Sequence, residues 1–383
     1  MPLAFWPPSP QPFSTAKECL LAVWVLAGFV IAGAGRLLKR KLPSRALAAI
    51  AIWIIALSLS AGTGDEASIH ELIRNLLPCA GFLLLLLAGM RPRQIVLALV
   101  CSGTVVALIA ILQFAKLDPF VLLNLTGSLQ GSSRIRIFST LGNPNFVAAF
   151  LTAILPLTAC CIEIEDEKKA CPRIWRILQI TAGLMQAGAI AATGSRAPIL
   201  GLVAVSIWIL FRKALFRMRF VITGLAICAL VILFSPARPL EKTIAGRFYI
   251  WEIVRAHVPE IPLAGYGPGA FQLRFAEWET NHLQTNPGNP DRSFAGLQDH
   301  AHNDYLEFLV DYGFVGLFAF LPVIGLSPLL FRRGSRPLLE NGISASIIAL
   351  LAVAMVDFPL HRPTELYLFW TQLALLWILE EKI

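Results

Sequence analysis

The chain has 383 residues, of which 56% are apolar and only 15% are charged. Its mean hydropathy is +0.68, whereas roughly a quarter of the residues of a soluble domain are charged. This composition excludes an ordinary soluble protein and predicts an all-α polytopic membrane protein. In such a protein the net charge of +8 reports on membrane topology and not on nucleic-acid binding.

Apolar runs recur along the whole chain, and each is long enough to cross the core of a bilayer. We expect about eleven transmembrane helices from this periodicity. Helices 1–8 fall in residues 1–235, a large, partly helical periplasmic loop fills residues 236–303, and helices 9–11 fall in residues 304–383. The expected spans are 18–35, 45–61, 72–89, 94–115, 145–162, 174–192, 197–212, 219–235, 304–331, 338–356 and 365–380.

Lys and Arg residues gather in alternate loops between these spans. Most of them fall in residues 36–45, 91–93, 168–176, 212–219 and 332–336. Because cytoplasmic loops are enriched in Lys and Arg, this side is assigned to the cytoplasm and the N-terminus to the outside. An odd number of spans in this orientation is unusual, and it is compatible with a further span upstream of Met1.

The outward loops contain the unusual polar clusters of the sequence. These loops are residues 116–144, 193–196, 236–303 and 357–363. Clusters with a purely structural purpose would be divided between the two faces. The one-sided distribution therefore predicts a functional site on the outer face.

Within the large loop, we expect a helix from about Arg247 to Val258, ended by Pro259. It places Arg247, Trp251 and Arg255 on one face, because they are four residues apart. The glycine-rich residues 265–269 predict a tight turn that lets the backbone approach a ligand or a helix end. Residues 281–299 are rich in Asn, Pro, Gly and Asp and are expected to be irregular.

Arginine residues in the outward loops are candidate anion ligands. Arg196 lies between two spans with almost no loop, so it either extends to lipid phosphate or binds a phosphate through its planar guanidinium. Arg247 belongs either to a solvated basic helix face or to the same phosphate site. Arg134 and Arg136 are weaker candidates, because nothing in the sequence fixes where they point.

Two histidines, His300 and His302, precede the span that begins at residue 304. Imidazole exchanges protons near neutral pH, which favours a general base over a structural histidine. A metal site is less favoured, because no third strong ligand is evident. Asn303 and Tyr305 would orient the imidazole or a sugar hydroxyl.

The last outward turn, residues 357–363, contains Asp357 and His361. It is either a turn at the membrane interface or a lid that contributes these side chains to the same site.

Three of these stretches together resemble the O-antigen ligase and polymerase superfamily of bacterial membrane glycosyltransferases. They are residues 193–196, residues 247–251 followed by 265–269, and residues 302–313. Residues 142–145 and 357–363 also fit. Each motif alone is loose, but their order and their common outward side make the match fairly specific.

The resemblance implies an inverting, metal-independent glycosyltransferase that needs no cofactor. Such an enzyme moves a glycan from undecaprenyl pyrophosphate to an acceptor hydroxyl at the periplasmic face of the bacterial inner membrane. The acceptor is the lipid A core or a similar glycolipid for a ligase, and another lipid-linked repeat unit for a polymerase. The resemblance matches Arg196 and Arg247 to pyrophosphate-binding arginines and His302 to the histidine near the acceptor, and the preference for His302 over His300 comes from this match.

Elementary chemistry agrees with these roles. Pyrophosphate gains charge as the sugar bond breaks, and guanidinium groups already in place stabilise that charge most where water is scarce. An acceptor hydroxyl attacks faster when a base takes its proton, and attack opposite the leaving group inverts the anomeric centre. The loop aromatic residues Trp251, Phe271, Phe275 and Trp278 are expected to close over the sugars.

A transporter or flippase for lipid-linked glycans is the alternative from a different class. It predicts charged residues deep within the spans, where we find mainly Gln113, Gln186 and Gln372. The expected partners are a lipid-linked glycan donor, a glycan or glycolipid acceptor and membrane lipid, with no nucleic acid. The sequence leaves open the choice between ligase and polymerase and the identity of the glycan.

Overall fold

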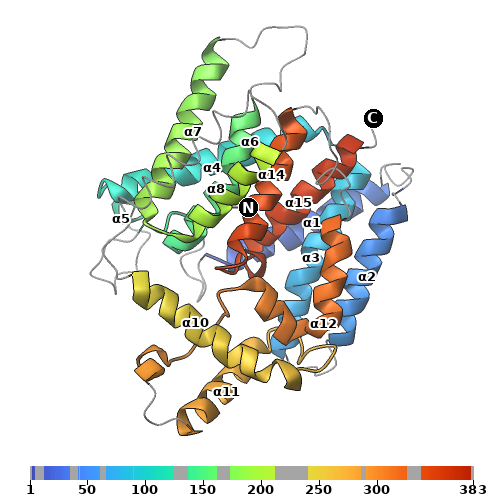
Figure 1. Ribbon diagram of the computed structural model, residues 1–383. Coiled ribbons are helices and arrows are strands. Elements are labelled where there is room, and N and C mark those ends of the chain that lie inside the picture. The colour runs from blue at the N-terminus through green and yellow to red at the C-terminus, as the bar shows by residue number, and fades with distance from the viewer. Residues whose placement is uncertain are drawn as a thin grey trace.

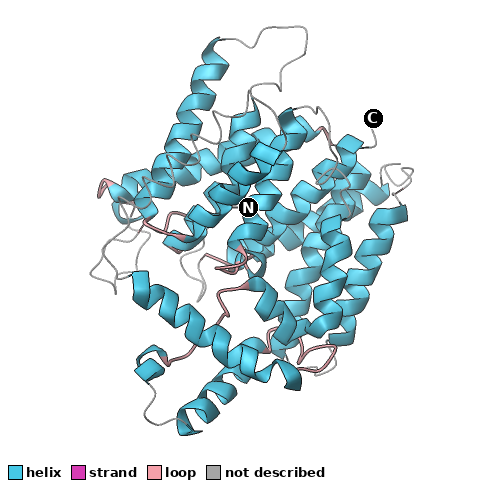
Figure 2. Cartoon of the chain, viewed as in Figure 1, coloured by secondary structure: helices cyan, strands magenta, loops and turns pink. Residues whose placement is uncertain are grey.

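A computed structural model describes residues 2–4, 13–34, 42, 44–60, 66–88, 90–123, 137–161, 173–211, 240–285, 290–325 and 338–380. Every regular element in these ranges is a helix (Figure 2), which confirms the all-α prediction for the part of the chain that is described. The expected span 219–235 and the candidates Arg134 and Arg136 lie outside the described residues.

The expected spans elsewhere coincide with helices. These are α1 (Thr15–Ala34), α2 (Ser44–Ser60), α3 (Glu66–Ala88), α4 (Pro92–Phe114), α6 (Pro144–Cys160), α7 (Arg173–Thr193), α8 (Ala197–Phe211), α12 (Asp304–Gly325), α14 (Leu338–Val353) and α15 (Pro363–Glu380). The short α5 (Pro119–Leu122) follows α4.

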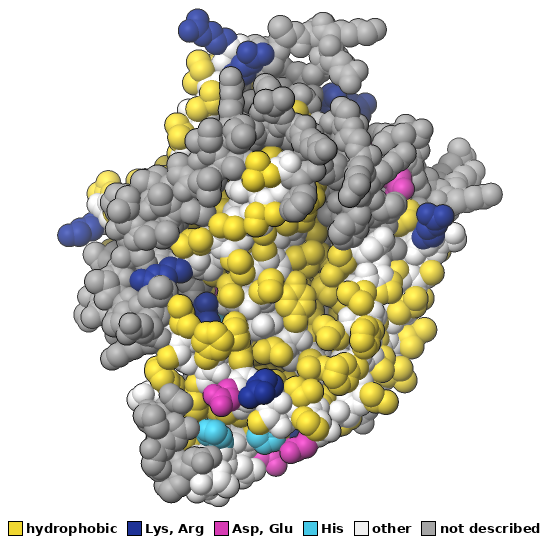
Figure 3. Space-filling model, in the orientation of Figure 1, with side chains coloured by type: hydrophobic (Ala, Val, Ile, Leu, Met, Phe, Trp, Pro, Cys, Tyr) yellow, Lys and Arg dark blue, Asp and Glu magenta, His cyan; other side chains and the backbone are white. Residues whose placement is uncertain are grey.

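Within the described residues, three helices are long and apolar enough to cross a membrane. They are Ser68–Ala88 of α3, the whole of α4 and the whole of α12, and α2, α6, α8 and α14 include shorter apolar helices. Figure 3 shows apolar side chains over the described middle of the bundle, His side chains at the end that carries α10 and α11, and Lys and Arg side chains at both ends. These features support a membrane protein, and the number of about eleven spans stays a prediction.

The bundle is held together by pairs of neighbouring helices. Helix α14 packs against α6 and α8, α12 packs against α2, and α15 packs against α3. Figure 1 shows that α10 and α11 lie together at one end of this bundle, next to the start of α12. The two helices of the large loop therefore lie against the start of α12.

Helix α10 in the large loop begins earlier than we expected. It covers Leu240–His257 instead of Arg247 to Val258, and a 3₁₀ turn, η5 (Val258–Glu260), follows it. Leu, Glu and Lys in its first turn favour a helix, and Gly246 inside it does not end it. Pro259 lies at the start of η5, so the predicted position of the helix end is right to within one residue.

Helix α11 (Phe271–Thr285) corrects two expectations. Residues 281–285 are helical and not irregular, because they continue a helix whose apolar residues repeat at helical spacing. Phe275 and Trp278 lie in the core between α10 and α11 and are buried. They are therefore part of the support of the loop and not a lid over sugars. A further 3₁₀ turn, η6 (Pro290–Phe294), follows in the same region.

The glycine-rich turn approaches a helix, as predicted. Tyr266 N and Gly267 N donate hydrogen bonds to the carbonyls of Val310 and Asp311 at a kink in α12, where Gly313 has φ +64°. A Cβ atom on Gly265 would lie 2.3 Å from the Asp311 carbonyl oxygen, so only glycine fits there. The turn fixes the large loop to the start of α12.

Candidate active site

The start of α12 is built by a local cap. Asn303 Oδ1 accepts hydrogen bonds from Tyr305 N at 3.0 Å and Leu306 N at 3.2 Å, which makes Asn303 the N-cap of the helix. The residue before it, His302, has φ +51°, a conformation that is costly for a residue with a Cβ atom and is found most often at functional sites.

Asp357 is the centre of a charged cluster on one side of this helix start. Its side chain is fully buried. Arg362 Nη1 donates to Asp357 Oδ2 at 3.2 Å, and His302 Nδ1 lies 3.6 Å from Asp357 Oδ1. Because the Nδ1 edge of His302 faces the carboxylate, Nε2 is the ring nitrogen that is available to a substrate. We call Asp357, His302, Arg362 and Arg247 the Asp357 cluster.

Arg247 joins the cluster through its charge. Burial raises the pKa of Asp357, but Arg362, His302 and Arg247 outweigh burial and lower that pKa to about 2. Burial also lowers the pKa of Arg247, and the charge of Asp357 opposes this effect. The structure therefore brings together Arg247 from α10, His302 and Asp357, which are 110 residues or less apart in the chain, around one buried carboxylate.

Arg196 lies at the same end of the bundle. It directly precedes α8, after a turn in which Gly194 has φ +62°. The next residue, Ala197, packs in one cluster with Val353 and Val356, and Val356 is the neighbour of Asp357 in sequence. Helix packing thus places the backbone of Arg196 beside the turn that carries Asp357.

A second group of charged residues lies on the other side of the Phe358 ring. His361 Nδ1 lies 2.5 Å from Asp304 Oδ1, and His300 Nδ1 donates to Glu307 Oε1 at 2.7 Å. Burial alone would lower the pKa of His361, but Glu307 and Asp304 outweigh it and raise that pKa to about 10. We call His300, Glu307, His361 and Asp304 the Glu307 cluster.

Phe358 separates the two clusters. Its ring stacks on His300 with centroids 3.9 Å apart, and its centroid lies 5.3 Å from that of His302. Arg362 lies over the Phe358 ring as well, at 5.2 Å from the centroid. One aromatic ring thus stands between the two histidines that the sequence could not rank.

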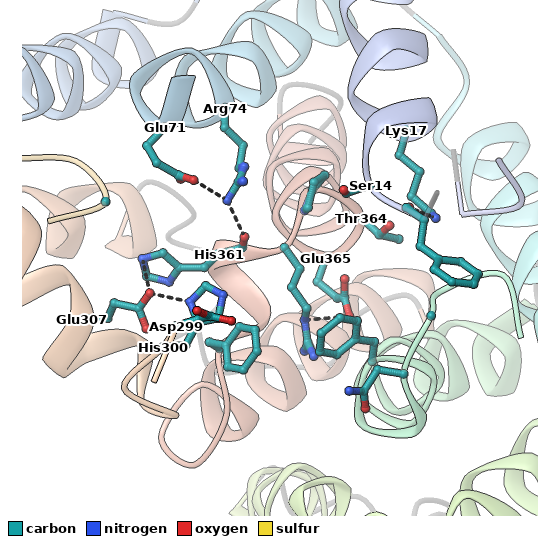
Figure 4. A pocket seen from close by; sticks show the side chains of 18 of the residues that line it. Ser14, Lys17, Glu71, Arg74, Asp299, His300, Glu307, His361, Thr364 and Glu365 are labelled. Carbon is teal, nitrogen blue, oxygen red and sulfur yellow. Dashed lines mark hydrogen bonds and ion pairs between the residues drawn. The ribbon is translucent and has the colours of Figure 1, made fainter. Parts of the chain in front are cut away.

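The Glu307 cluster opens onto a cavity of about 730 Å³. Figure 4 shows Glu71, Arg74, His361, His300 and Glu307 on one side of it and Lys17, Ser14, Thr364 and Glu365 on the other. Phe358 and Arg362 line it too, whereas Arg196, Arg247, His302 and Asp357 do not. The cavity therefore shares Arg362 with the Asp357 cluster and does not include the other members of that cluster.

Several predicted contact residues have structural partners. Trp251 Nε1 donates to the Ala301 carbonyl at 2.9 Å, so Trp251 positions the segment between the two histidines. Tyr305 Oη donates to the Leu351 carbonyl at 2.8 Å, which connects α12 to α14. Arg255 is exposed further along α10. Whether these side chains also contact a substrate stays a prediction.

The sequence analysis missed Arg362, Phe358 and the acidic face of α12. Asp304, Glu307 and Asp311 are buried on that helix. Their spacing of three and four residues places them on one helix face, and this pattern at the start of an apolar span could have identified them. Arg362 gave no such signal, because basic residues are common near the ends of transmembrane helices.

The described residues contain no group of three or more His, Cys, Asp or Glu side chains that could hold a metal ion. Metal independence of the reaction stays a prediction.

Comparison with known proteins gives one family. Residues 181–321 match the family described as O-antigen ligase. The matched region includes Arg196, Arg247 and His302 and ends within α12, before Asp357. No curated protein was found to match the chain.

Proposed function

We propose that this membrane protein, whose residues 181–321 match the O-antigen ligase family, transfers a glycan from undecaprenyl pyrophosphate to an acceptor hydroxyl. The proposed site faces the periplasm from the bacterial inner membrane. The observation that carries the proposal is the Asp357 cluster, in which a half-exposed histidine and a buried arginine face one ionised carboxylate.

The proposed step is a direct displacement. The acceptor oxygen attacks the anomeric carbon, its proton passes to His302 Nε2, and the bond from that carbon to the pyrophosphate oxygen breaks. The bonding electrons leave with the pyrophosphate, so the anomeric centre is inverted. His302 acts as the general base in this step.

Asp357 supports that base. A carboxylate facing Nδ1 holds the imidazole in the form that has its proton on Nδ1, which leaves Nε2 free to accept a proton. The same carboxylate stabilises the imidazolium that forms. The distance of 3.6 Å is longer than a hydrogen bond, and such contacts often shorten only when substrate binds.

Arg247 and Arg196 are proposed to bind the pyrophosphate. A guanidinium stabilises charge on the leaving oxygens best when it is partly desolvated, and Arg247 is half-buried near Asp357. Arg196 approaches the same turn through Ala197. A third arginine, Arg362, is buried against Asp357 and Glu365, so we assign it to holding Asp357.

The test uses purified protein in lipid nanodiscs with an undecaprenyl-pyrophosphate-linked glycan and a lipid A core acceptor, in the presence of EDTA. The proposal predicts a glycosylated acceptor and free undecaprenyl pyrophosphate in equal amounts. Longer glycans on the carrier, without glycosylated acceptor, would identify a polymerase. No consumption of the donor in any mixture would overturn the proposal.

A further inference from the structure

The cavity beside the Glu307 cluster has the size of a ligand site. Its volume of about 730 Å³ lies within the range of about 300–1,000 Å³ that is usual for small-molecule pockets. It is bounded by the start of α1, by α3, by the start of α11 and by the turn that leads into α15. These elements come from four distant parts of the chain, so the cavity is a feature of the folded protein.

Two basic side chains of the cavity already have partners within the protein. Arg74 Nη1 pairs with Glu71 at 2.7 Å and also donates to the His361 carbonyl at 3.2 Å. Lys17 Nζ donates to the Thr140 carbonyl at 2.8 Å. Acidic side chains also line the cavity, and they would repel a strongly anionic ligand such as pyrophosphate.

The remaining chemistry suits a polyhydroxylated ligand. Arg362 and Glu365 both line the cavity, where Arg362 Nε pairs with Glu365 Oε1 at 3.2 Å. Guanidinium N–H groups donate hydrogen bonds and carboxylate oxygens accept them, as the hydroxyls of a sugar require. The rings of Phe146, Phe271 and Phe358 also line the cavity and offer flat apolar faces to the C–H side of a sugar ring.

The position of the cavity relative to His302 indicates which of the two substrates, the donor or the acceptor, binds in the cavity. The Phe358 ring lines the cavity and also contacts His302, with centroids 5.3 Å apart, whereas the proposed pyrophosphate ligands Arg196 and Arg247 do not line the cavity. In an inverting reaction the nucleophile approaches from the side opposite the leaving group. An acceptor in this cavity would approach His302 from the side that the arginines leave open.

We propose that the cavity binds the acceptor glycan through an uncharged, hydroxyl-rich segment and directs its nucleophilic hydroxyl past Phe358 to His302. This inference rests on the proposed function for the reaction, but the binding itself can be measured without the donor. The carrier-linked glycan of the donor has the same chemistry, and the KM values for donor and acceptor distinguish the two ligands.

Gln272 provides the test position. It is exposed at the rim of the cavity, where its amide donates to Asp299 at 2.8 Å. Gln272→Trp narrows the entrance. Leu273→Trp is the matched control, because Leu273 is the next residue of α11, is 69% exposed and does not line the cavity. Equal thermal midpoints of both variants would show that they fold alike.

The first measurement is binding of a dephosphorylated core oligosaccharide, without donor, by saturation-transfer NMR on the purified full-length chain. We expect binding to the unchanged protein and to Leu273→Trp, and weakening of about tenfold or more in Gln272→Trp. Absence of binding to the unchanged protein, or equal binding to both variants, overturns the inference.

The second measurement is transfer kinetics with the undecaprenyl-pyrophosphate-linked glycan. We expect Gln272→Trp to raise the KM for the acceptor by a similar factor, with a much smaller change in the KM for the donor. A rise in the donor KM alone would assign the cavity to the donor glycan and overturn the inference. Failure of the unchanged protein to consume donor, while it still binds the oligosaccharide, would count against the proposed function and not against the cavity.

Discussion

The two His-carboxylate clusters on either side of Phe358 have similar composition and different environments. In the Glu307 cluster, His361 is buried and lies within 2.5 Å of Asp304. In the Asp357 cluster, the His302 side chain is 31% exposed and its contact with the carboxylate is looser, at 3.6 Å. A histidine held tightly in its protonated form stabilises the fold, whereas a loosely held, accessible histidine can exchange protons with a substrate.

The backbone supports the same distinction. His302 has a left-handed conformation, whereas Asp304 and Glu307 of the Glu307 cluster lie on α12 and His361 lies on a short 3₁₀ turn, η7 (Pro359–His361). Strain of this kind persists only where the surroundings impose it. Here the N-cap of α12 and the Trp251 hydrogen bond fix the residues on either side.

Apart from substitution of the base His302, substitution of Arg247 is expected to reduce the rate of transfer more than any other change in the Asp357 cluster. Arg247→Gln removes a guanidinium that would stabilise the leaving pyrophosphate, and transfer should fall by about 10²–10³-fold. Arg274→Gln is the control, because Arg274 lies in the same loop and pairs with Glu277 on the surface. Equal activity of the two variants, measured as glycosylated acceptor per minute, would remove Arg247 from the site.

Asp357→Asn should affect both the reaction and the fold. It removes one of the two carboxylates that pair with the buried Arg362, and breaking a buried pair in this way costs about 3–5 kcal/mol. We expect a lower free energy of unfolding in denaturant titrations in mixed micelles, together with reduced transfer. A variant of normal stability would show that Arg362 is held by Glu365 alone.

The Glu307 cluster predicts a dependence of stability on alkaline pH. The pKa of His361 is raised from 6.5 to about 10 in the folded protein. Its contribution is therefore complete below pH 6.5, decreases as the pH rises, and is lost above about pH 10. The thermal midpoint of the unchanged protein should exceed that of His361→Gln at neutral pH, and the difference should shrink towards pH 10. A constant difference would contradict the assigned charge.

The smallest expected effect is that of His300→Ala. His300 is occupied by Glu307 and by the stacked Phe358 ring, so its loss should reduce transfer by less than about tenfold. The measurement is the rate at saturating acceptor. A loss as large as that of His302→Ala would exchange the roles of the two clusters.

Local pattern in the sequence was enough to predict most of the described helices. Long apolar runs identify α4 and α12, and the glycines of residues 265–269 identified a close backbone approach before any contact was known. These features depend on neighbours in sequence. The helical part of residues 281–285 was missed, because Asn and Thr there disfavour a helix locally and packing between α10 and α11 overrides that preference.

The pairing of the site residues could not be predicted, because it depends on contacts across long stretches of chain. The sequence predicted that His300, His302, Asp357 and His361 face the same side of the membrane. It could not show that Asp357 selects His302 while Asp304 and Glu307 take His361 and His300. Arg362 also became visible only through its buried position between two carboxylates.

The most direct test of the account is the His302→Ala variant, assayed for donor binding and transfer in the same nanodisc preparation. The account predicts that undecaprenyl pyrophosphate binds as it does to the unchanged protein, because the arginines remain, while transfer falls by about 10²–10⁴-fold. Transfer within about twofold of the unchanged protein would contradict the assignment of His302 as the base.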